Sequence, residues 1–235
     1  MLGKCVLDFF KLKDFQVITI GSRWPEKQFK KSILSEMNVE CIINCIGAIP
    51  ERDTNFSINY DIPLWLDSLP DNVTRKVIYP GTDCKKEESE YASSKHVAIN
   101  KLSRESKKTK VINCSIIGFN DRPYGLLQWL LDSKSNIVRG YTSFFWNGIT
   151  CLEWSKICYS IIDDWRNYPT ITIPFSECLS KYELLSIIIK VFDLNKTIVR
   201  DNTVRADRCL IGNFKTKDIE EQLVELNQYS TYTKE

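Results

Sequence analysis

The 235-residue chain contains a single histidine, His96, and none of its nine cysteines belongs to a C-x-x-C pair. Zinc sites are built mainly from histidine and cysteine at short, regular spacings, so we expect no metal site. The net charge is only +2, which gives no reason to expect a nucleic acid or a membrane surface as a partner. We recognise no signal peptide and no apolar run of transmembrane length. The expected partner is a small molecule.

The cysteines lie mostly in apolar stretches typical of strands, as Cys41, Cys45 and Cys114 do, or on expected helices. In such places cysteine behaves as a small apolar residue. We therefore expect reduced, buried thiols and a cytoplasmic protein. The length allows one nucleotide-binding domain with a small appendage, but not two large domains.

Two neighbouring segments organise the rest of the chain: the β-branched run 77–84, Val-Ile-Tyr-Pro-Gly-Thr-Asp-Cys, and the segment 91–95, Tyr-Ala-Ser-Ser-Lys. If the first is a strand and the second opens a helix, Thr82 lies at the carboxyl end of the strand. Tyr91 and Lys95 are four residues apart and then project from one face of the helix. This arrangement is that of a reductase site.

Carbonyl reduction needs these three residue types together. A phenol with a pKa of about 10 exchanges protons poorly at neutral pH, so an ammonium one helical turn away is expected to lower the pKa of Tyr91. Lys95 is placed to do this. The Thr82 hydroxyl can bind the substrate carbonyl oxygen while Tyr91 donates a proton and a hydride arrives from a nicotinamide. We predict Thr82, Tyr91 and Lys95 as catalytic residues.

A structural interpretation of the Tyr91–Lys95 pair stays open, because ten tyrosines in a lysine-rich chain produce such a match by chance. A tyrosine ring packed on a lysine stem is also common on helix surfaces. The strand that ends at Thr82, and the alternation of strands and helices on both sides, favour the catalytic interpretation.

Alternating strand and helix patterns predict a doubly wound parallel sheet with helices on both faces. The expected elements of this part are strands 16–20, 39–46, 75–80 and 110–114 and helices 4–13, 26–38, 59–66 and 91–105. Further on we expect helices 124–131, 151–163, 181–192 and 218–227, strands 137–142, 170–174 and 197–200, and an aromatic loop 144–150. The predicted division is a nucleotide-binding domain, 1–120, a small substrate-binding α/β portion, 121–228, and a frayed tail, 229–235.

The first expected helix begins directly after Met1-Leu-Gly3. In a dinucleotide-binding fold such a helix follows a strand and a glycine-rich turn, and the pyrophosphate binds at its N-terminus. Gly3 has the position of the last glycine of that turn. We therefore expect a Rossmann-like sheet without its first strand, in which neighbouring strands lose their hydrogen-bond partner.

Gly21-Ser-Arg23 follows the expected strand 16–20, where NAD-binding proteins carry an acidic residue for the ribose. Ser22 and Arg23 could instead accept a 2′-phosphate, which favours NADP(H) over NAD(H). An ordinary turn with one solvated arginine stays open as the alternative.

These motifs together resemble the extended short-chain dehydrogenase/reductases, in the branch of dTDP-4-dehydrorhamnose reductases and related nucleotide-sugar reductases and epimerases. The resemblance covers most of residues 1–215. It rests on Met1-Leu-Gly3, Asn44-Cys-Ile-Gly47, Asn59-x3-Pro63, Thr82-Asp83, Tyr91-x3-Lys95, Ile116-Ile-Gly118 and Trp146-Asn-Gly-Ile-Thr150. Each motif alone is weak, and the set is specific. The charged run 85–88 stands where the family usually has a longer flap.

The resemblance implies roles for further residues. It places the cofactor against Gly3, Gly47, Ala48, Tyr91 and Lys95, with Gly3 at the pyrophosphate and Gly47 and Ala48 on the adenosine side. It places the sugar nucleotide against Ile117, Gly118, Trp146 and Asn147. Arg139 and Arg208 are candidates for contacts to the diphosphate, with ordinary surface arginines as the open alternative.

The function that the resemblance implies is an NADP(H)-dependent reductase, or epimerase/reductase, of a 4-keto-6-deoxy nucleotide sugar in surface polysaccharide or glycan synthesis. NAD(H) stays open as the cofactor, and a homodimer stays open as the assembly. The alternative is a non-catalytic regulatory or binding subunit on the same fold. The incomplete glycine turn favours that alternative, and the intact set of Thr82, Tyr91 and Lys95 opposes it.

Overall fold

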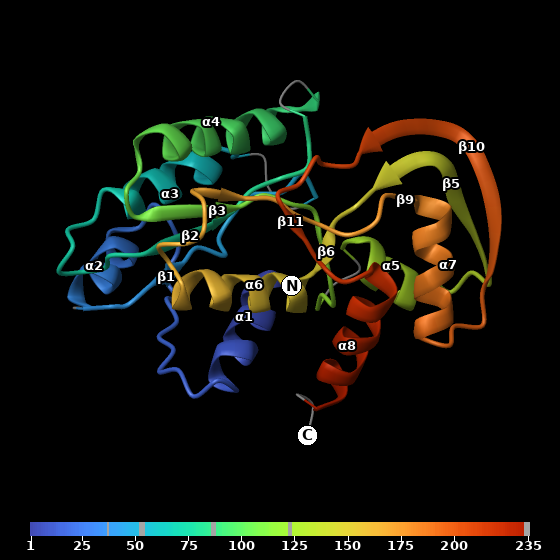
Figure 1. Ribbon diagram of the computed structural model, residues 1–235, viewed down its shortest axis with the longest axis horizontal. Helices are drawn as coiled ribbons and strands as arrows, with labels where there is room; N and C mark the ends of the chain where they lie inside the picture. Colours follow the sequence, from blue (N-terminus) through green and yellow to red (C-terminus); the bar gives the residue numbers. More distant parts are fainter. Residues whose placement is uncertain (37, 52–54, 86–87, 122–123, 233–235) are drawn as a thin grey trace. The chain divides into compact units, whose positions relative to one another are not determined.

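The computed structural model describes residues 1–36, 38–51, 55–85, 88–121 and 124–232. Its contacts divide the chain into two compact units, each made of several segments (Figure 1). The first unit comprises residues 1–9, 114–157 and 173–235, and the second comprises residues 10–113 and 158–172. The predicted division at residue 120 concerns binding roles, so it stays a prediction.

The second unit is built on a four-stranded parallel sheet with the order β1-β2-β3-β7. Its strands are β1 (Ile42–Ile43), β2 (Val77–Pro80), β3 (Thr109–Ile112) and β7 (Ile171–Thr172). Every residue of β2 and β3 is buried, as expected of parallel strands that are covered on both faces. Pro80 at the end of β2 lies opposite Ile112 at the end of β3. The carboxyl ends of these two strands therefore meet at one edge of the sheet.

Helices cover both faces of this sheet, which confirms the predicted doubly wound architecture. Helices α3 (Ile58–Asp67) and α4 (Glu90–Glu105) lie side by side on one face, and residues 158–163 of α6 (Cys151–Asp163) lie on the other (Figure 1). Helix α2 (Lys27–Ser35) buries Phe29 and Ile33. Two apolar clusters join helices and sheet; one includes Phe29, Ile62, Leu66 and Val77, and the other Tyr79, Ala98, Leu102 and Val111.

The predicted strand 16–20 does not form. Residues 15–20 are neither strand nor helix, and no backbone hydrogen bond joins residues 16–20 to another described segment. A strand is stable only when a neighbour completes its ladder, so β-branched composition alone is not enough. Ile20 still packs against the cluster that contains Phe29, whereas Ile18 is 51% exposed.

Other predicted boundaries shift. The expected strand 39–46 forms only as β1, with an isolated bridge between Val39 and Thr74. The expected strand 170–174 divides into β7 of the second unit and β8 (Pro174–Phe175), which pairs with β11 (Phe214–Lys215) in the first unit. Residue 37 of the predicted helix 26–38, residues 86 and 87 of the charged run and residues 233–235 of the tail lie outside the described residues.

The first unit contains a three-stranded sheet with the order β10-β5-β9. Strand β5 (Ile137–Trp146) pairs in parallel with β10 (Thr197–Arg208) and antiparallel with β9 (Leu179–Ser180). The predicted aromatic loop 144–150 is therefore wrong in its first part, because Phe144 to Trp146 continue β5 opposite the charged end of β10. Aromatic residues suit a pleated surface, and the polar run 201–208 obscured the partner strand in the sequence.

Helices complete the first unit. α7 (Lys181–Val191) packs on β5 and contacts α8 (Ile219–Tyr232); α5 (Leu126–Asp132) and residues 2–9 of α1 (Leu2–Lys11) also belong to this unit, as does the short pair β4 (Ile116–Ile117) and β6 (Ile149–Thr150). The buried Gln222 side chain of α8 accepts a hydrogen bond from Thr150 N at 3.0 Å. Helix α8 continues to Tyr232, so the tail is not frayed from Tyr229 as predicted.

Cys178 and Cys209 form a disulfide bond across 31 residues of sequence. The expectation that all nine thiols are reduced is therefore wrong for this pair, and the other seven cysteines form no disulfide bond in the described part of the chain. The two cysteines lie in polar surroundings without a regular spacing, so the sequence did not reveal the pair.

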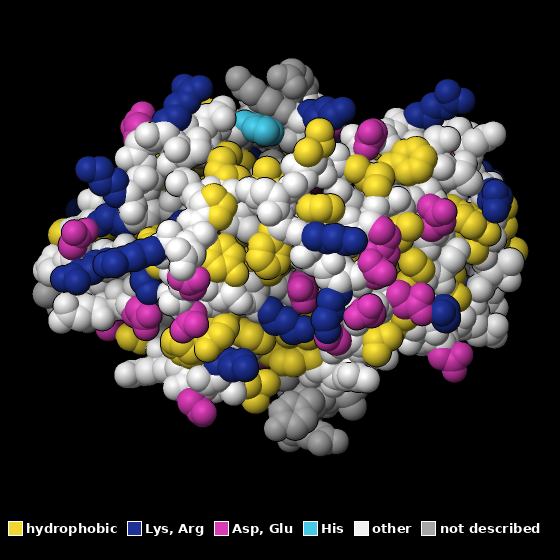
Figure 2. Space-filling model, in the orientation of Figure 1, with side chains coloured by type: hydrophobic (Ala, Val, Ile, Leu, Met, Phe, Trp, Pro, Cys, Tyr) yellow, Lys and Arg dark blue, Asp and Glu magenta, His cyan; other side chains and the backbone are white. Residues whose placement is uncertain are grey.

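The surface carries charges of both signs. Figure 2 shows Lys and Arg side chains interspersed with Asp and Glu side chains across the visible face. Within the described residues, no helix is both long enough and apolar enough to cross a bilayer.

Candidate active site

Thr82 lies directly beyond the carboxyl end of β2 and is 3% exposed. The side chain of Asn113, beyond the end of β3, accepts a hydrogen bond from Thr82 N at 2.9 Å. The residue between β2 and Thr82 is Gly81, where a Cβ atom would lie 2.1 Å from Asn113 Oδ1. Only glycine permits this approach, which fixes the backbone of Thr82.

Helix α4 brings Tyr91 to Thr82. Its N-cap Ser89 accepts a hydrogen bond from Ala92 N at 3.1 Å, so the helix begins immediately before Tyr91. Tyr91 therefore lies in the first turn, and Lys95 lies one turn later on the buried side. The Thr82 hydroxyl is near enough to the Tyr91 phenol to lower its pKa. The structure thus places two of the three predicted catalytic side chains near each other.

Burial dominates the acidity of Tyr91. It raises the pKa of Tyr91 to about 12, although the Thr82 hydroxyl acts in the opposite direction. Lys95 is not among the groups that shift this pKa, so the predicted lowering by the ammonium is not found. The reason is geometric, because Lys95 Nζ donates its hydrogen bond elsewhere. At neutral pH Tyr91 is therefore a protonated, half-buried phenol.

The Lys95 side chain crosses under the end of β2. Its Nζ donates a hydrogen bond to Pro80 O at 3.0 Å and lies 4.6 Å from the centroid of the Tyr79 ring. Burial lowers the pKa of Lys95 to about 8, and the nearby thiol of Cys45 opposes that shift. The Lys95 ammonium can therefore lose its proton not far above neutral pH, and it lies at the same strand end as Thr82.

Asn59 of α3 joins the predicted cofactor turn to helix α4. Its Oδ1 accepts from Ala48 N at 2.9 Å, and its Nδ2 donates to Ala48 O at 3.1 Å and to Ser94 Oγ at 3.0 Å. Its backbone oxygen accepts from the Tyr79 hydroxyl at 2.7 Å. Four structural elements, β1 with its turn, α3, β2 and α4, therefore meet at this one buried asparagine.

The turn after β1 exposes the backbone of Gly47 beside Lys95. A Cβ atom at Gly47 would lie 3.0 Å from Asn59 Oδ1 and 3.8 Å from Lys95 Nζ. Gly47 is exposed and Ala48 is buried. Four of the predicted cofactor residues, Gly47, Ala48, Tyr91 and Lys95, are thus brought together in the second unit. Gly3, which is exposed near the start of α1, belongs to the first unit.

Ser22 and Arg23 lie in the second unit, after the extended segment 16–20. The Ser22 hydroxyl is buried without a hydrogen-bond partner in the described part of the chain. Arg23 is exposed, and its backbone N donates to Glu26 Oε2 at 3.4 Å. Ser22 and Arg23 are neighbours in the sequence, and a hydroxyl and a guanidinium are both donors that a phosphate group can accept.

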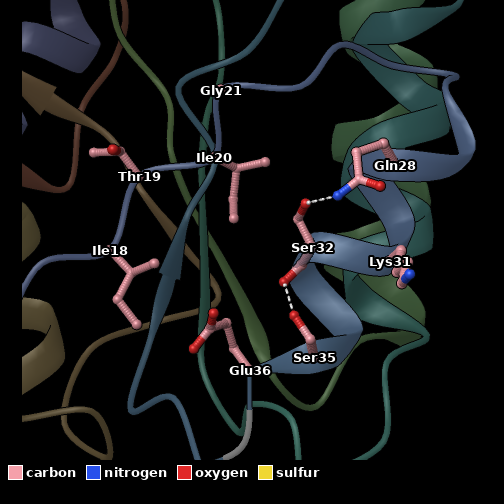
Figure 3. A pocket seen from close by; sticks show the side chains of 9 residues that line it. All are labelled: Ile18, Thr19, Ile20, Gly21, Gln28, Lys31, Ser32, Ser35 and Glu36. Carbon is pink, nitrogen blue, oxygen red and sulfur yellow. Dashed lines mark hydrogen bonds between the residues drawn. The ribbon is translucent and has the colours of Figure 1, made fainter.

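The residues that line a cavity of about 290 Å³ include Ile18 to Gly21, which come just before Ser22 in the sequence. The cavity lies between the extended segment 18–21 and one face of α2 (Figure 3). The helix side is polar, and some of its side chains already have partners within α2: Gln28 donates to Ser32 Oγ at 3.2 Å, and Ser35 Oγ donates to the backbone oxygen of Ser32 at 2.9 Å (Figure 3). None of the residues predicted to bind cofactor or substrate lines this cavity.

All predicted substrate residues lie in the first unit. Ile117, Gly118 and Trp146 are buried. The side chain of Asn147 makes two hydrogen bonds within the fold, since Nδ2 donates to Leu210 O and Oδ1 accepts from Leu210 N, both at 2.9 Å. Its role is therefore to hold the chain beyond β10.

The two candidate arginines are not brought together. Arg208 lies opposite Trp146, with its guanidinium 5.8 Å from the centroid of the Phe144 ring. Arg139 lies seven residues before Trp146 on β5, roughly 23 Å along the strand. It pairs with Asp201 at 3.7 Å and its side chain is 78% exposed. Of the two arginines, only Arg208 lies beside the aromatic end of β5, so it stays the better candidate for a contact to the diphosphate.

Sequence reasoning missed the roles of Asn59 and Asn113. The motif Asn59-x3-Pro63 supported the resemblance without a role, and Asn113 directly follows β3. A polar residue next to the end of a buried parallel strand is the signal that could have identified Asn113.

In the described part of the chain, one group of potential metal ligands gathers, formed by Cys178, Asp207 and Cys209. The two sulfur atoms are joined to each other, so they offer no thiolate ligands.

No protein-family model matches the chain, and no curated protein matches its sequence. Solved structures do resemble it. The dTDP-4-dehydrorhamnose reductase of Bacillus anthracis in complex with NADP matches with a TM-score of 0.79 at 12% identity, covering 97% of this chain and 95% of that chain. The dTDP-4-dehydrorhamnose reductase of Clostridium acetobutylicum matches with a TM-score of 0.75 at 14% identity, covering 98% and 96%.

A third solved structure, the UDP-glucose 4-epimerase of Thermotoga maritima with UDP-glucose, matches with a TM-score of 0.72 at 12% identity, covering 100% of this chain and 97% of that chain. At these identities the likeness concerns the fold. The resemblance found in the sequence is confirmed at that level: the chain has the fold of dTDP-4-dehydrorhamnose reductases and of nucleotide-sugar epimerases.

Proposed function

We propose that this protein is an NADP(H)-dependent reductase, or epimerase/reductase, of a 4-keto-6-deoxy nucleotide sugar. The observation that carries the proposal is that Thr82 and Lys95 are buried at the carboxyl end of β2, with Tyr91 in the first turn of α4 near enough for the Thr82 hydroxyl to lower its pKa. Ligands of doubly wound sheets bind at the carboxyl ends of the strands. A proton donor, a hydroxyl and an ammonium at that edge suit the reduction of a carbonyl group.

The protonation states and hydrogen bonds of Tyr91, Thr82 and Lys95 support a role for each in this reaction. Tyr91 keeps its proton up to a pKa of about 12, so it is loaded as a general acid and transfers that proton to the carbonyl oxygen. Thr82, held by Asn113, donates a hydrogen bond to the same oxygen and orients it. Lys95, with its pKa lowered to about 8 and its Nζ held by Pro80 O, lies at the same strand end, where it is placed to contact the ribose of the cofactor.

The residues of the second unit fit a dinucleotide. A bound nicotinamide would supply the hydride. Gly47 leaves backbone exposed beside the Lys95 ammonium, which suits close approach of a ribose. The unsatisfied Ser22 hydroxyl and the exposed Arg23 suit a 2′-phosphate and favour NADP(H) over NAD(H).

For the sugar nucleotide, we propose the first unit as the binding side, with Arg208 near the diphosphate and the aromatic end of β5 beside it. The solved reductases and epimerases with this fold support the substrate class. In this proposal the enzyme works in the cytoplasm, without a nucleic-acid or membrane partner, in the synthesis of surface polysaccharides or other glycans.

The test is a turnover assay of the full chain with NADPH and a panel of dTDP-, UDP- and GDP-linked 4-keto-6-deoxy sugars, following loss of NADPH and formation of the reduced sugar. The expected result is turnover of at least one member of the panel. If the chain binds NADPH but turns over none of them, the proposal is overturned in favour of a non-catalytic binding subunit.

A further inference from the structure

The disulfide of the first unit lies at the end of its central strand. Cys178 directly precedes β9 and Cys209 directly follows β10, and these are the two strands on either side of β5. Trp146, the last residue of β5, pairs with Leu179 on one side and with Arg208 on the other. Extending both registers by one residue places the two cysteines on either side of Asn147.

The short distance between the two cysteines shows that the chain segments next to β9 and β10 come together beyond the end of β5. Strands on opposite sides of a central strand are about 9–10 Å apart. The Cα atoms of Cys178 and Cys209 are only 5.9 Å apart. The chain segments that leave β9 and β10 therefore converge past the end of β5, and the disulfide fixes them there.

Several contacts besides the disulfide hold the chain beyond β10. Asn213 N and Phe214 N donate to Ile173 O at 3.1 and 3.2 Å, and β11 pairs with β8. Asn147 bonds both backbone groups of Leu210 at 2.9 Å, and Cys209 N donates to Asp207 Oδ1 at 3.0 Å. Ile211, which follows Leu210, is 97% exposed. Arg208 is the residue immediately before Cys209. Arg208 is therefore held on one side by its pairing with Trp146 in the β10–β5 ladder and on the other by the disulfide at Cys209.

The disulfide is accessible to a reductant. Cys178 is exposed and Cys209 is partly exposed, whereas four of the free cysteines, Cys5, Cys114, Cys151 and Cys158, are buried. Thiol–disulfide exchange requires direct access of a thiolate to a sulfur atom, so this bond is open to exchange.

We propose that the Cys178–Cys209 disulfide is a redox-controlled clasp, which holds Arg208 in place when oxidised and releases it when a dithiol reduces the bond. A thiolate of the dithiol attacks one sulfur atom of the bond and forms a mixed disulfide with it, and the other cysteine leaves as a thiol. The second thiol of the dithiol then attacks the mixed disulfide and releases the remaining cysteine as a thiol. The protein gains two electrons and two protons as two thiols, and the dithiol becomes a disulfide. The consequence for substrate affinity rests on the proposed function, which places the nucleotide sugar beside Arg208.

The test compares the full chain prepared without reductant with the same protein treated with dithiothreitol, and with the double variant Cys178→Ser/Cys209→Ser. Amide hydrogen exchange of residues 205–213 reports the clasp directly. KM for the nucleotide sugar and Kd for NADPH report its consequence. We expect reduction to speed exchange in this segment and to raise KM about tenfold at unchanged Kd for NADPH. The double variant should behave like the reduced protein and ignore dithiothreitol.

Several results would overturn the clasp. They are a count of nine free thiols in protein prepared without reductant, unchanged exchange at residues 205–213 after reduction, and faster exchange with unchanged KM. Failure of the proposed function gives a different pattern, in which no nucleotide sugar is turned over in either redox state. In that case the exchange measurement still decides whether the disulfide controls this segment.

Discussion

Asn59 grips the backbone of Ala48 with both ends of its side-chain amide, accepting from N at 2.9 Å and donating to O at 3.1 Å. The same amide donates to Ser94, the neighbour of Lys95 in α4. The turn that carries Gly47 is therefore held at a fixed distance from helix α4. A change at Asn59 should act on stability and on cofactor affinity together.

Asn59→Ala should lower the free energy of unfolding by about 2–4 kcal/mol, because it leaves the buried N–H and C=O of Ala48 without partners. Urea unfolding of the purified variant measures this. Asn100→Ala is the matched control, since Asn100 is exposed on α4, and it should change stability by less than about 0.5 kcal/mol. Equal effects of the two substitutions would contradict the role given to Asn59.

Gly81→Ala should destabilise the protein and reduce turnover. Its Cβ atom would lie 2.1 Å from Asn113 Oδ1 and 2.9 Å from Asn113 Cα, so the strand ends must separate at a cost of about 1–3 kcal/mol. Gly21→Ala is the control, because nothing lies within 4 Å of its Cβ position. Thermal unfolding and kcat should both distinguish the pair. A fully active, stable Gly81→Ala protein would remove Asn113 as the support of Thr82.

Lys95→Met should change the pH dependence of stability. Burial lowers the pKa of Lys95 from 10.5 to about 8, so between these values the unfolded chain binds more protons at this residue than the folded chain. The parent protein should therefore lose stability relative to Lys95→Met as the pH falls from about 10.5 to 8, with little further change below pH 8.

The size of this effect follows from the shift of the Lys95 pKa. It corresponds to about 3 kcal/mol over the whole range. Urea unfolding of both proteins at pH 7, 8, 9 and 10 provides the comparison. A stability difference that does not vary with pH would show that Lys95 is not an ionisable group at a lowered pKa.

Arg23→Asp should weaken NADPH binding about tenfold or more and leave NADH binding unchanged or improved, because a carboxylate repels the 2′-phosphate. Arg75→Asp, at another exposed arginine of the second unit, controls for the change in net charge. Fluorescence titration with each cofactor gives the constants. If the parent protein binds both cofactors equally, Arg23 does not contact the phosphate.

The sequence predicted the second unit well where a local sequence pattern coincides with a neighbouring element that completes the strand or helix. Val77 to Pro80 form a buried strand, and α4 begins one residue before the predicted position at Tyr91. These elements have local signals, namely a β-branched run and the serine cap at Ser89. Segment 16–20 has the same composition as a strand, but pairing depends on a neighbour that composition does not describe.

The first unit was harder to predict because its contacts are distant in sequence. The last third of β10 is polar, and it becomes a strand only because it pairs with Ser143 to Trp146 of β5. The Cys178–Cys209 bond depends on the same convergence of strands. At the candidate site, the acidity of Tyr91 was predicted with the wrong sign, since burial exceeds the effect of the Thr82 hydroxyl and Lys95 turns to Pro80.

Tyr91→Phe tests the central claim most directly. The substitution removes one hydroxyl and keeps the ring against Phe56, whose centroid is 6.1 Å away. The account predicts a change in unfolding free energy below about 1.5 kcal/mol, unchanged NADPH affinity, and a fall in kcat of about 10²–10⁴-fold with a 4-keto-6-deoxy nucleotide sugar. Turnover at the parental rate would show that Tyr91 is not the proton donor and that the active site lies elsewhere.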